Sequence, residues 1–375
     1  MAELAVRPEV IPLKSGTVAT GNKDIRYVIE RQDRRLARLD FQLNVTLGGT
    51  ILTTTVGDRL EGYVKNLTVK ASDTGGSRRD IFSQGSATLL HWQRLHLGKL
   101  SRHQATVVGQ ATAGTYLLTV PLFFMHPLAM NPVGYGMSLP LWPKDNAGVG
   151  LGDDLEVNVE LAAMDTAGCR LGASATVTVN PARMIASFVE LGRDGSAAAG
   201  IPYIPQALVT NDFDIASTGE QSLQIPEDGF LTSMLFEQFS NQTGTRGTAL
   251  AAPLTDYYRL FYGASEVDIA IPSQCQLDDE LWADSYPTDD SVLNAHNGSD
   301  VRSATVPSEN IFTRNFWHRF PQAEARLLNS CPNLWKAGAK GDGFKIKPTN
   351  VAASTRLRVT SHKMLVNNPN ILTGA

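Results

Sequence analysis

The sequence predicts an all-β fold of two tandem eight-stranded β-sandwiches, each with a short helix in a loop. Three observations lead to this prediction. In Leu155–Leu161, apolar and polar side chains alternate strictly, which is typical of a strand with one buried face. Residues 116–124 are apolar at nearly every position, as in a strand covered on both faces. The same order of parts recurs about half a chain later, which indicates a second sandwich.

The length of the chain predicts two domains, because 375 residues exceed what one hydrophobic core usually holds. Its 32 glycines and 19 prolines follow no short period, so they indicate many turns rather than disorder. The predicted organisation is an N-terminal arm at 1–37, a first sandwich at 38–191, a connector at 192–227, a second sandwich at 228–366 and a C-terminal tail at 367–375.

Charge and composition argue against several classes of protein. The formal net charge of −4 does not suit a protein that coats nucleic acid through basicity alone. No stretch approaches the ~18 consecutive apolar residues of a membrane-spanning helix, and the first residues lack the apolar core of a secretory signal. Cys169, Cys275 and Cys331 are far apart, so we expect thiols in a reducing cytoplasm rather than disulfides.

In the first half, residues 39–47 alternate as a half-buried strand does, and a second strand is expected at 63–69 before a turn-rich loop at 71–80. The period changes at 83–100, where a serine start signal and a terminal glycine bound a helix of about twelve residues. Pro121 places its strand near a sheet edge or a bulge, because proline cannot donate to a ladder. Further strands are expected at 105–108, 116–124, 137–141, 154–161, 175–179 and 184–191.

The second half follows the same plan. Strands are expected at 229–239, 257–271, 311–320, 344–347 and 357–365, and a helix at 276–284. Sequence identity between the halves is negligible, so the order of the elements repeats although the amino acids do not. Two large units of this kind indicate a duplicated domain rather than a solenoid.

Residues 24–40 form an arginine-bearing segment with two open interpretations. It contains Arg26, Arg31, Arg34, Arg35 and Arg38 among Asp24, Glu30, Asp33 and Asp40. One interpretation is an inward-facing arm that touches lipid headgroups or phosphate. The other is a solvated helix or strand edge whose charges pair with one another.

The stretch from Thr115 to Leu161 resembles part of a known protein family. It places Pro121-Leu122-Phe123-Phe124 at the end of a strand, then Leu139-Pro140-Leu141 between two loops, then the strand Leu155–Leu161. This pattern resembles the double jelly-roll major capsid proteins of tailless icosahedral bacteriophages and large DNA viruses. The motif covers about 45 residues, and the layout covers residues 30–366. The chain lacks the aromatic-His pair before the final strand, and its short loops fit a small bacteriophage better than a giant virus.

The resemblance implies a structural protein that is not an enzyme. Such a protein self-assembles as trimeric, pseudo-hexagonal capsomers that form an icosahedral shell. It would be located in the virion after assembly in the host cytoplasm. Its partners would be two further copies, neighbouring capsomers, and penton, vertex and minor capsid proteins. The arginines of the N-terminal arm would face an internal membrane or the genome.

No constellation predicts catalytic, cofactor-binding or metal-binding residues. His91, His96 and His103 lack the spacing of metal ligands on one helix face, so we expect surface or interface histidines. The glycine runs at 148–152 and 338–343 lead into strands, which is the wrong context for a phosphate cradle and predicts hairpin loops.

The acidic segment 278–290 leaves one question open. Its acids are Asp278, Asp279, Glu280, Asp284, Asp289 and Asp290. Carboxylate oxygens suit Ca²⁺, but the glycine-spaced pattern of a calcium loop is missing. A solvated acidic helix start is the simpler interpretation.

Two alternative functions compete with the capsid interpretation. One is a carbohydrate-binding or carbohydrate-active tandem β-sandwich, for which only Trp317 and Tyr262 look suitably placed. The other is a phage receptor-binding or penton-type protein. Two halves of similar size favour a capsid tile over a penton, which needs only one jelly roll.

Overall fold

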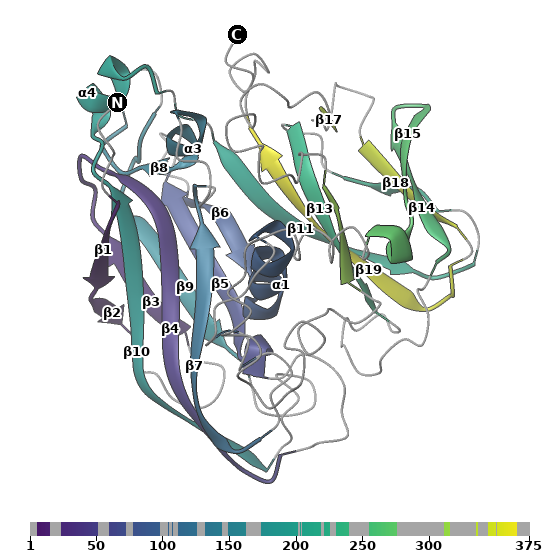
Figure 1. Ribbon diagram of the computed structural model, residues 1–375, viewed down its shortest axis with the longest axis horizontal. Helices are drawn as coiled ribbons and strands as arrows, with labels where there is room; N and C mark the ends of the chain where they lie inside the picture. Colours follow the sequence, from purple (N-terminus) through teal and green to yellow (C-terminus); the bar gives the residue numbers. More distant parts are fainter. Residues whose placement is uncertain are drawn as a thin grey trace, which may run out of the picture. The chain divides into compact units, whose positions relative to one another are not determined.

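A computed structural model describes residues 6–15, 24–51, 60–72, 78–97, 104, 107, 112–125, 132–144, 149–162, 174–201, 203, 205–218, 221–225, 230–239, 255–275, 311–315, 335–336, 344–349 and 351–365. The chain forms two units, which we describe separately (Figure 1). Unit 1 comprises Met1–Thr53, Asp58–Leu90 and Ser101–Gln206, and unit 2 comprises Thr54–Gly57, His91–Leu100 and Ala207–Ala375.

The first sheet of unit 1 is antiparallel and follows the order β1, β10, β4, β7. These strands are β1 (Val6–Ile11), β10 (Ala175–Val189), β4 (Arg35–Gly49) and β7 (Gly114–Phe123), and the short β8 (Leu139–Pro140) also pairs with β4. β7, the strand that contains Pro121, ends the order, which confirms the edge position predicted for it.

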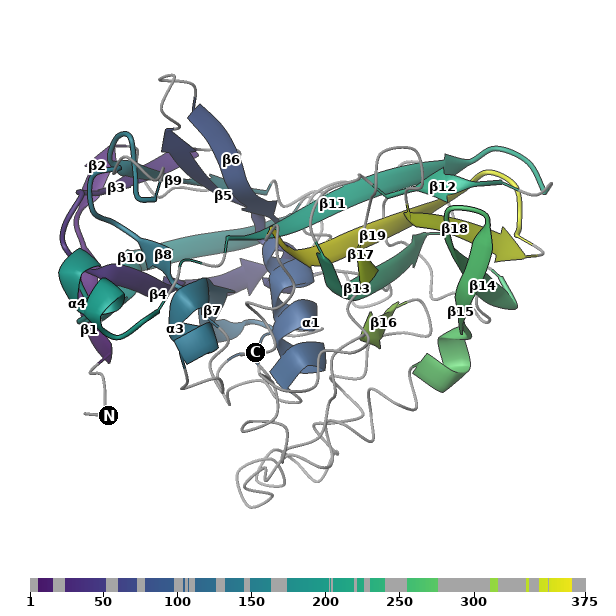
Figure 2. The same cartoon turned by 90° about the horizontal axis from the view of Figure 1, so that it is seen from above.

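The second sheet of unit 1 follows the order β6, β5, β9, β3, β2 and is also antiparallel. Its strands are β2 (Leu13–Ser15), β3 (Asp24–Ile29), β9 (Leu155–Leu161), β5 (Val64–Ser72) and β6 (Arg78–Gln84). Figure 2 shows the two sheets of unit 1 as separate layers.

Alternation along the strands creates the core of unit 1. Every second residue of β9 is buried, and the residues between them are partly exposed, as predicted. The same alternation holds in β4 from Phe41 to Leu47. The rings of Tyr27 on β3 and Phe41 on β4 meet edge to face with centroids 6.2 Å apart, so they join the two layers.

The predicted helix is α1 (Ser86–Leu97), and it has twelve residues. The buried Ser86 hydroxyl donates to the carbonyl oxygen of Glu61 in η1 (Leu60–Gly62). It also accepts the backbone N–H of Val64 at 3.2 Å. These bonds fix the first residue of the helix to η1 and β5 of unit 1.

Unit 2 also contains two sheets. The first follows the order β16, β13, β19, β11, with β17 also paired to β13. Its strands are β11 (Gln206–Ile215), β13 (Phe230–Phe239), β16 (Ile311–Asn315), β17 (Trp335–Lys336) and β19 (Thr355–Met364).

The second sheet of unit 2 has four strands in the order β12, β18, β14, β15. They are β12 (Leu223–Gln224), β18 (Phe344–Thr349), β14 (Tyr257–Tyr262) and β15 (Ser265–Ala270), and all three pairings are antiparallel. The second half of the chain therefore repeats the layered arrangement of the first, as the order of parts predicts.

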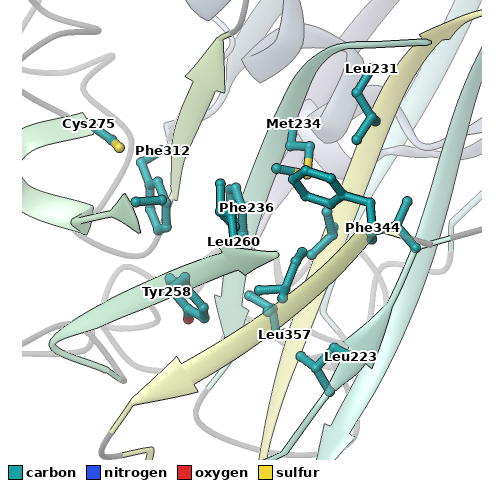
Figure 3. Packing of buried hydrophobic residues seen from close by; sticks show 14 of the residues in the cluster. Leu223, Leu231, Met234, Phe236, Tyr258, Leu260, Cys275, Phe312, Phe344 and Leu357 are labelled. Carbon is teal, nitrogen blue, oxygen red and sulfur yellow. The ribbon is translucent and has the colours of Figure 1, made fainter. Parts of the chain in front are cut away.

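An aromatic cluster forms the centre of the unit 2 core (Figure 3). The rings of Phe236 and Phe312 are stacked, with centroids 4.8 Å apart and planes 6° from parallel. Tyr258 packs against both rings from the other sheet, at 5.3 Å and 5.9 Å. Cys275 is buried in the same cluster. Burial of these large side chains is the main source of stability in unit 2.

The N-terminal segment differs from the arm predicted at 1–37. β1 is antiparallel to β10 with Val6 opposite Val189, and β3 is antiparallel to β9 with Ile29 opposite Leu155. Five of the six residues of β1 are exposed, so this strand has no periodic apolar pattern from which it could be predicted. The segment belongs to the sandwich of unit 1.

Other elements also differ from the prediction. The strands expected at 175–179 and 184–191 are one strand, β10, with an irregular register between Val179 and Ala182. The predicted connector contains α4 (Arg193–Ala198), β11 and β12. Helix α3 (Pro132–Met137) replaces the start of the strand expected at 137–141. The exact domain boundaries stay a prediction.

Some predicted elements lie outside the described residues. They are the strand at 105–108 apart from Val107, residues 73–77 of the loop at 71–80, residues 316–320 and the helix at 276–284. The rest of the loop contributes to β5 and β6.

Candidate functional site: the arginine segment

The arginine segment is the strongest candidate site that the sequence offers, and all five arginines lie among the described residues. Arg26 is on β3, Arg35 and Arg38 are on β4, and Arg31 and Arg34 are in the turn between these strands. Because β3 and β4 belong to opposite sheets, the turn crosses one end of the unit 1 sandwich.

The first two arginines of the segment pair with residues of β9 and of the turn before it. Arg26 Nη2 lies 2.6 Å from Glu156 Oε2. The backbone N–H of Arg31 donates to Asp154 Oδ1 at 3.0 Å, and its Nη1 donates to the carbonyl oxygen of Gly152 at 3.3 Å. Surface pairs of this kind contribute ~0–1 kcal/mol each, so they orient the turn more than they stabilise it.

Arg34 connects β1 to the rest of unit 1. Its two terminal nitrogens contact both carboxylate oxygens of Glu9 on β1, and Nη1 also donates to Glu190 at 3.1 Å. Its Nε donates to the side-chain oxygen of Gln32 at 3.1 Å, and the guanidinium lies 4.3 Å from the centroid of the buried Phe188 ring. The hydrogen bond from Arg34 lowers the pKa of Glu9.

Arg35 is enclosed by the protein, and its side chain is 1% exposed. Its Nε donates to the Ser196 hydroxyl at 3.1 Å, and its terminal nitrogens donate to the carbonyl oxygens of Tyr135 and Ile201, both at 3.2 Å. The guanidinium also lies 5.1 Å from the Trp142 ring centroid. Burial lowers the pKa of Arg35 to about 10. The prediction that this arginine touches a membrane or genome is wrong, because its donors are used inside the fold.

The groups bonded to Arg35 come from α3, α4 and the residues that follow α4. A second contact places α4 at the same end of unit 1, since Asp33 Oδ1 accepts the backbone N–H of Arg193 at 2.7 Å. A Cβ at position 192 would lie 2.3 Å from Asp33 Oδ2, so a larger residue than Gly192 would force the Asp33 side chain to move. The turn from β3 to β4 therefore organises the loops at this end of the sandwich.

Arg38 pairs with Asp40 two residues further along β4, with Nε 2.8 Å from Oδ2. Asp40 is 7% exposed, and burial raises the pKa of its carboxyl group although the charge of Arg38 opposes the shift. The guanidinium of Arg38 lies 5.9 Å from the ring of Phe123 on the neighbouring strand.

The geometry therefore supports the paired-charge interpretation of the segment. Each of the five guanidinium groups has a partner inside unit 1, and for four of them that partner includes a carboxylate. A phosphate or lipid headgroup would have to compete with these carboxylates. The segment is a structural clamp for the end of the sandwich.

The other residues considered from the sequence provide no chemical site in the described part of the chain. The described residues contain no group of three or more His, Cys, Asp or Glu that could hold a metal ion. His91 and His96 lie on α1, but their side chains are outside the described set, as are His103 and the acidic segment 278–290. Gly148 of the first glycine run, the second run at 338–343, Cys169, Cys331 and Trp317 also lie outside it.

Two described residues from this search are parts of the scaffold. Tyr262 is half-buried on β14, and Gly150 adopts a positive φ of 111°. A Cβ at Gly150 would lie 2.5 Å from the carbonyl oxygen of Trp142, so this turn requires glycine. Among the described residues, no helix is long and apolar enough to cross a membrane.

The sequence analysis missed a charged ladder on unit 2. Arg356 Nε lies 2.7 Å from Asp214, and Arg358 Nε lies 2.7 Å from Asp212, so two arginines of β19 pair with two aspartates of β11. The two arginines are two residues apart, and so are the two aspartates. On a strand this spacing places like side chains on one face, which is a signal that could have revealed the ladder.

Comparison with solved structures identifies the fold. The STIV MCP has a TM-score of 0.57 and 12% identity, over 96% of this chain and 97% of that one. The major capsid protein P2 from bacteriophage PM2 has a TM-score of 0.53 and 11% identity, over 96% and 99%. The capsid of PBCV-1 gives a TM-score of 0.55 at 12% identity, over 96% and 93%.

These similarities cover both units, and the fold is the double jelly roll that the sequence predicts. No family model matches the sequence, and no curated protein is similar to it in sequence. The similarity in fold therefore comes with low sequence identity.

Proposed function

We propose that this chain is a major capsid protein, a structural protein that self-assembles into an icosahedral viral shell. The observation that supports this proposal is the similarity of both jelly-roll units together, over 96% of the chain, to the STIV MCP and to the P2 protein of bacteriophage PM2. A similarity to only one unit would suit many unrelated β-sandwich proteins.

In this proposal, three copies form a capsomer. Each copy contributes two layered units, so a closed ring of three presents six similar units and has a pseudo-hexagonal outline. Such an outline tiles a surface, because each capsomer is surrounded by six neighbours. The chain would act through the surfaces it buries between copies and not through a reactive group.

Further partners of the capsomer would be neighbouring capsomers and the penton, vertex and minor capsid proteins. The protein would reside in the virion and assemble in the cytoplasm of the host. The clamp geometry favours a structural role for the arginine segment. Contact with an internal membrane or the genome at Arg26, Arg31, Arg34 or Arg38 would require their ion pairs to open.

Size-exclusion chromatography with light scattering tests the proposal, followed by electron microscopy of the assembled fraction. We expect a heat-stable trimer that forms closed particles. A protein that stays monomeric and binds a glycan column would contradict the proposal and favour the carbohydrate-binding alternative. A protein that forms single spikes without tiles would favour the receptor-binding or penton-type alternative.

A further inference from the structure

The four-stranded sheet of unit 2 carries a group of cations on the face that points away from the core. Leu260 of β14 and Ile346 of β18 belong to the core cluster of unit 2. Because side chains alternate along a strand, their neighbours Arg259, Lys345 and Lys347 lie on the opposite face. We call this surface the basic face, defined by these three cations. All three side chains are partly exposed.

The three cations surround one aromatic ring. The guanidinium carbon of Arg259 lies 5.0 Å from the centroid of the Phe261 ring, and Lys347 Nζ lies 4.9 Å from it. Lys345 is the residue opposite Phe261 on the neighbouring strand. Phe261 is 9% exposed, so it is a fixed support against which two cations are held. The positive charge is therefore concentrated within two neighbouring strands.

The pairing of β14 with β18 breaks a rule that the chain follows elsewhere. Arg259 lies directly opposite Lys347, and like charges in such a cross-strand pair destabilise a sheet. In unit 1, by contrast, Lys70 lies opposite Glu156 on one neighbouring strand and opposite Asp80 on the other. A pair of like charges without an evident gain for the fold indicates a functional surface.

Carboxylates do not balance the charge of the basic face. Among the described residues of the four strands, one carboxylate lies on this face, that of Glu266, and it accepts a hydrogen bond from Arg259 Nε at 2.7 Å. Asp268 lies opposite Leu260 of the core and pairs with Arg314. Cations outnumber carboxylates even when the exposed Asp256, directly before β14, is counted. The net charge of the whole chain is −4, so this excess is local.

We propose that the basic face binds the phosphate backbone of nucleic acid without sequence preference. Lysine and arginine side chains neutralise phosphates and release their counterions, which is the main source of such binding. The Phe261 ring is buried and already in contact with two cations, so the contact uses phosphates and not base stacking. The choice of nucleic acid among linear polyanions rests on the proposed function, because a viral shell encloses a genome.

Fluorescence anisotropy of a labelled single-stranded oligonucleotide of mixed sequence tests the proposal, with the full chain at several salt concentrations. Three phosphate contacts at about −0.7 each should give a slope of about −2 in a plot of log K against log salt concentration. The double variant Lys345→Gln, Lys347→Gln should reduce the slope to about −0.7 and weaken binding about 25-fold at about 0.1 M salt. A second oligonucleotide of different sequence should bind equally well.

A matched double variant controls for net charge. Lys65→Gln with Lys70→Gln removes the same charge from β5 of unit 1, where both lysines have carboxylate partners. It should leave the affinity and the slope unchanged. The single variant Lys345→Gln leaves both contacts with the Phe261 ring in place, so it should stay folded and still reduce the slope by about 0.7.

The possible results separate the inference from the proposed function. An oligonucleotide that does not bind, or that both double variants weaken equally, overturns the inference. Binding of a sulfated polysaccharide but not of the oligonucleotide also overturns it, because the face would then select a different polyanion. Particles that form from a chain without the predicted binding leave the proposed function intact. A chain that binds with the predicted slope but never assembles confirms the inference and contradicts the proposed function.

Discussion

The Nε of Arg35 donates to the hydroxyl of Ser196 at 3.1 Å, which joins the first residue of β4 to α4 across 161 positions of sequence. Both side chains are buried, at 1% and 3% exposure. A fully buried guanidinium is tolerated because its donors meet main-chain carbonyl oxygens and a hydroxyl. This bond makes α4 part of unit 1, although its sequence looks like a linker.

Arg35→Met should lower the free energy of unfolding of unit 1 by about 3 kcal/mol, because it removes the N–H groups that donate to the buried Ser196 hydroxyl and to the Ile201 carbonyl oxygen. The control is Arg26→Gln, which removes a surface ion pair and should cost less than ~1 kcal/mol. Chemical denaturation followed by tryptophan fluorescence measures both changes. Equal effects of the two substitutions would contradict the clamp.

Tyr27→Phe should leave the stability of unit 1 unchanged or raise it by about 1 kcal/mol. The Tyr27 hydroxyl is buried without a hydrogen-bond partner, so its removal ends an uncompensated desolvation. The matched control is Tyr116→Phe, which loses the bond from the Tyr116 hydroxyl to the Thr112 carbonyl oxygen at 2.9 Å and should be mildly destabilising. A clear loss of stability in Tyr27→Phe would show that the hydroxyl does have a partner.

The same tyrosine predicts a dependence on alkaline pH. Burial raises the pKa of Tyr27 from 10.0 to about 12, so the folded chain favours the neutral phenol more than the unfolded chain does. The contribution of this preference to the free energy of unfolding is complete below pH 10 and is lost as the pH rises through about 12. Urea denaturation across this window should show a smaller loss of stability for Tyr27→Phe than for the parent chain.

Glu9→Gln should loosen β1 without unfolding unit 1. The carboxylate of Glu9 binds the guanidinium of Arg34, and this bond lowers the pKa of Glu9. The stability that the Glu9–Arg34 bond gives to β1 is therefore present above the ordinary pKa of a glutamate. It is lost as the pH falls through the lowered pKa of Glu9. Hydrogen exchange should be faster in the β1 amides of the variant at neutral pH. Glu160→Gln, which breaks the surface pair with Lys65, should leave β1 unchanged.

Phe312→Ala should destabilise unit 2 by about 3–5 kcal/mol, because it opens a cavity in the aromatic cluster. The double variant with Phe236→Ala should lose less than the sum of the two single changes, since the stacked rings share one contact of about 1 kcal/mol. Calorimetry measures all three. Strict additivity would contradict direct stacking.

The elements that could be predicted are those with a clear local signal in the sequence. β9 alternates along its full length, and α1 begins at a serine and is followed by Gly98. β1 could not be predicted, because five of its six residues are exposed and its pairing with β10 joins residues far apart in the sequence. Residues 193–198 resemble a loop in composition, and only the contact with Arg35 makes their place clear.

The arginine segment also shows that contacts between residues far apart in the sequence could not be predicted from a local pattern. Arg34 and Arg35 are neighbours in the sequence, yet one guanidinium pairs with surface carboxylates and the other lies inside the protein. No local pattern separates them, because the groups that receive Arg35 come from residues 135, 196 and 201. Charge pairing could be predicted from composition, but the choice of the buried arginine depends on the fold.

In the proposed shell, the lengths of β4 and β10 relate the thickness of the wall to the orientation of unit 1. Each has 15 residues, and at about 3.3 Å per residue a strand of this length extends about 50 Å. A shell in which these two strands point along the particle radius has a wall about 50 Å thick. Strands that lie in the plane of the shell would give a wall only as thick as two packed sheets. A radial density profile of the particle thus reports the orientation of unit 1 directly.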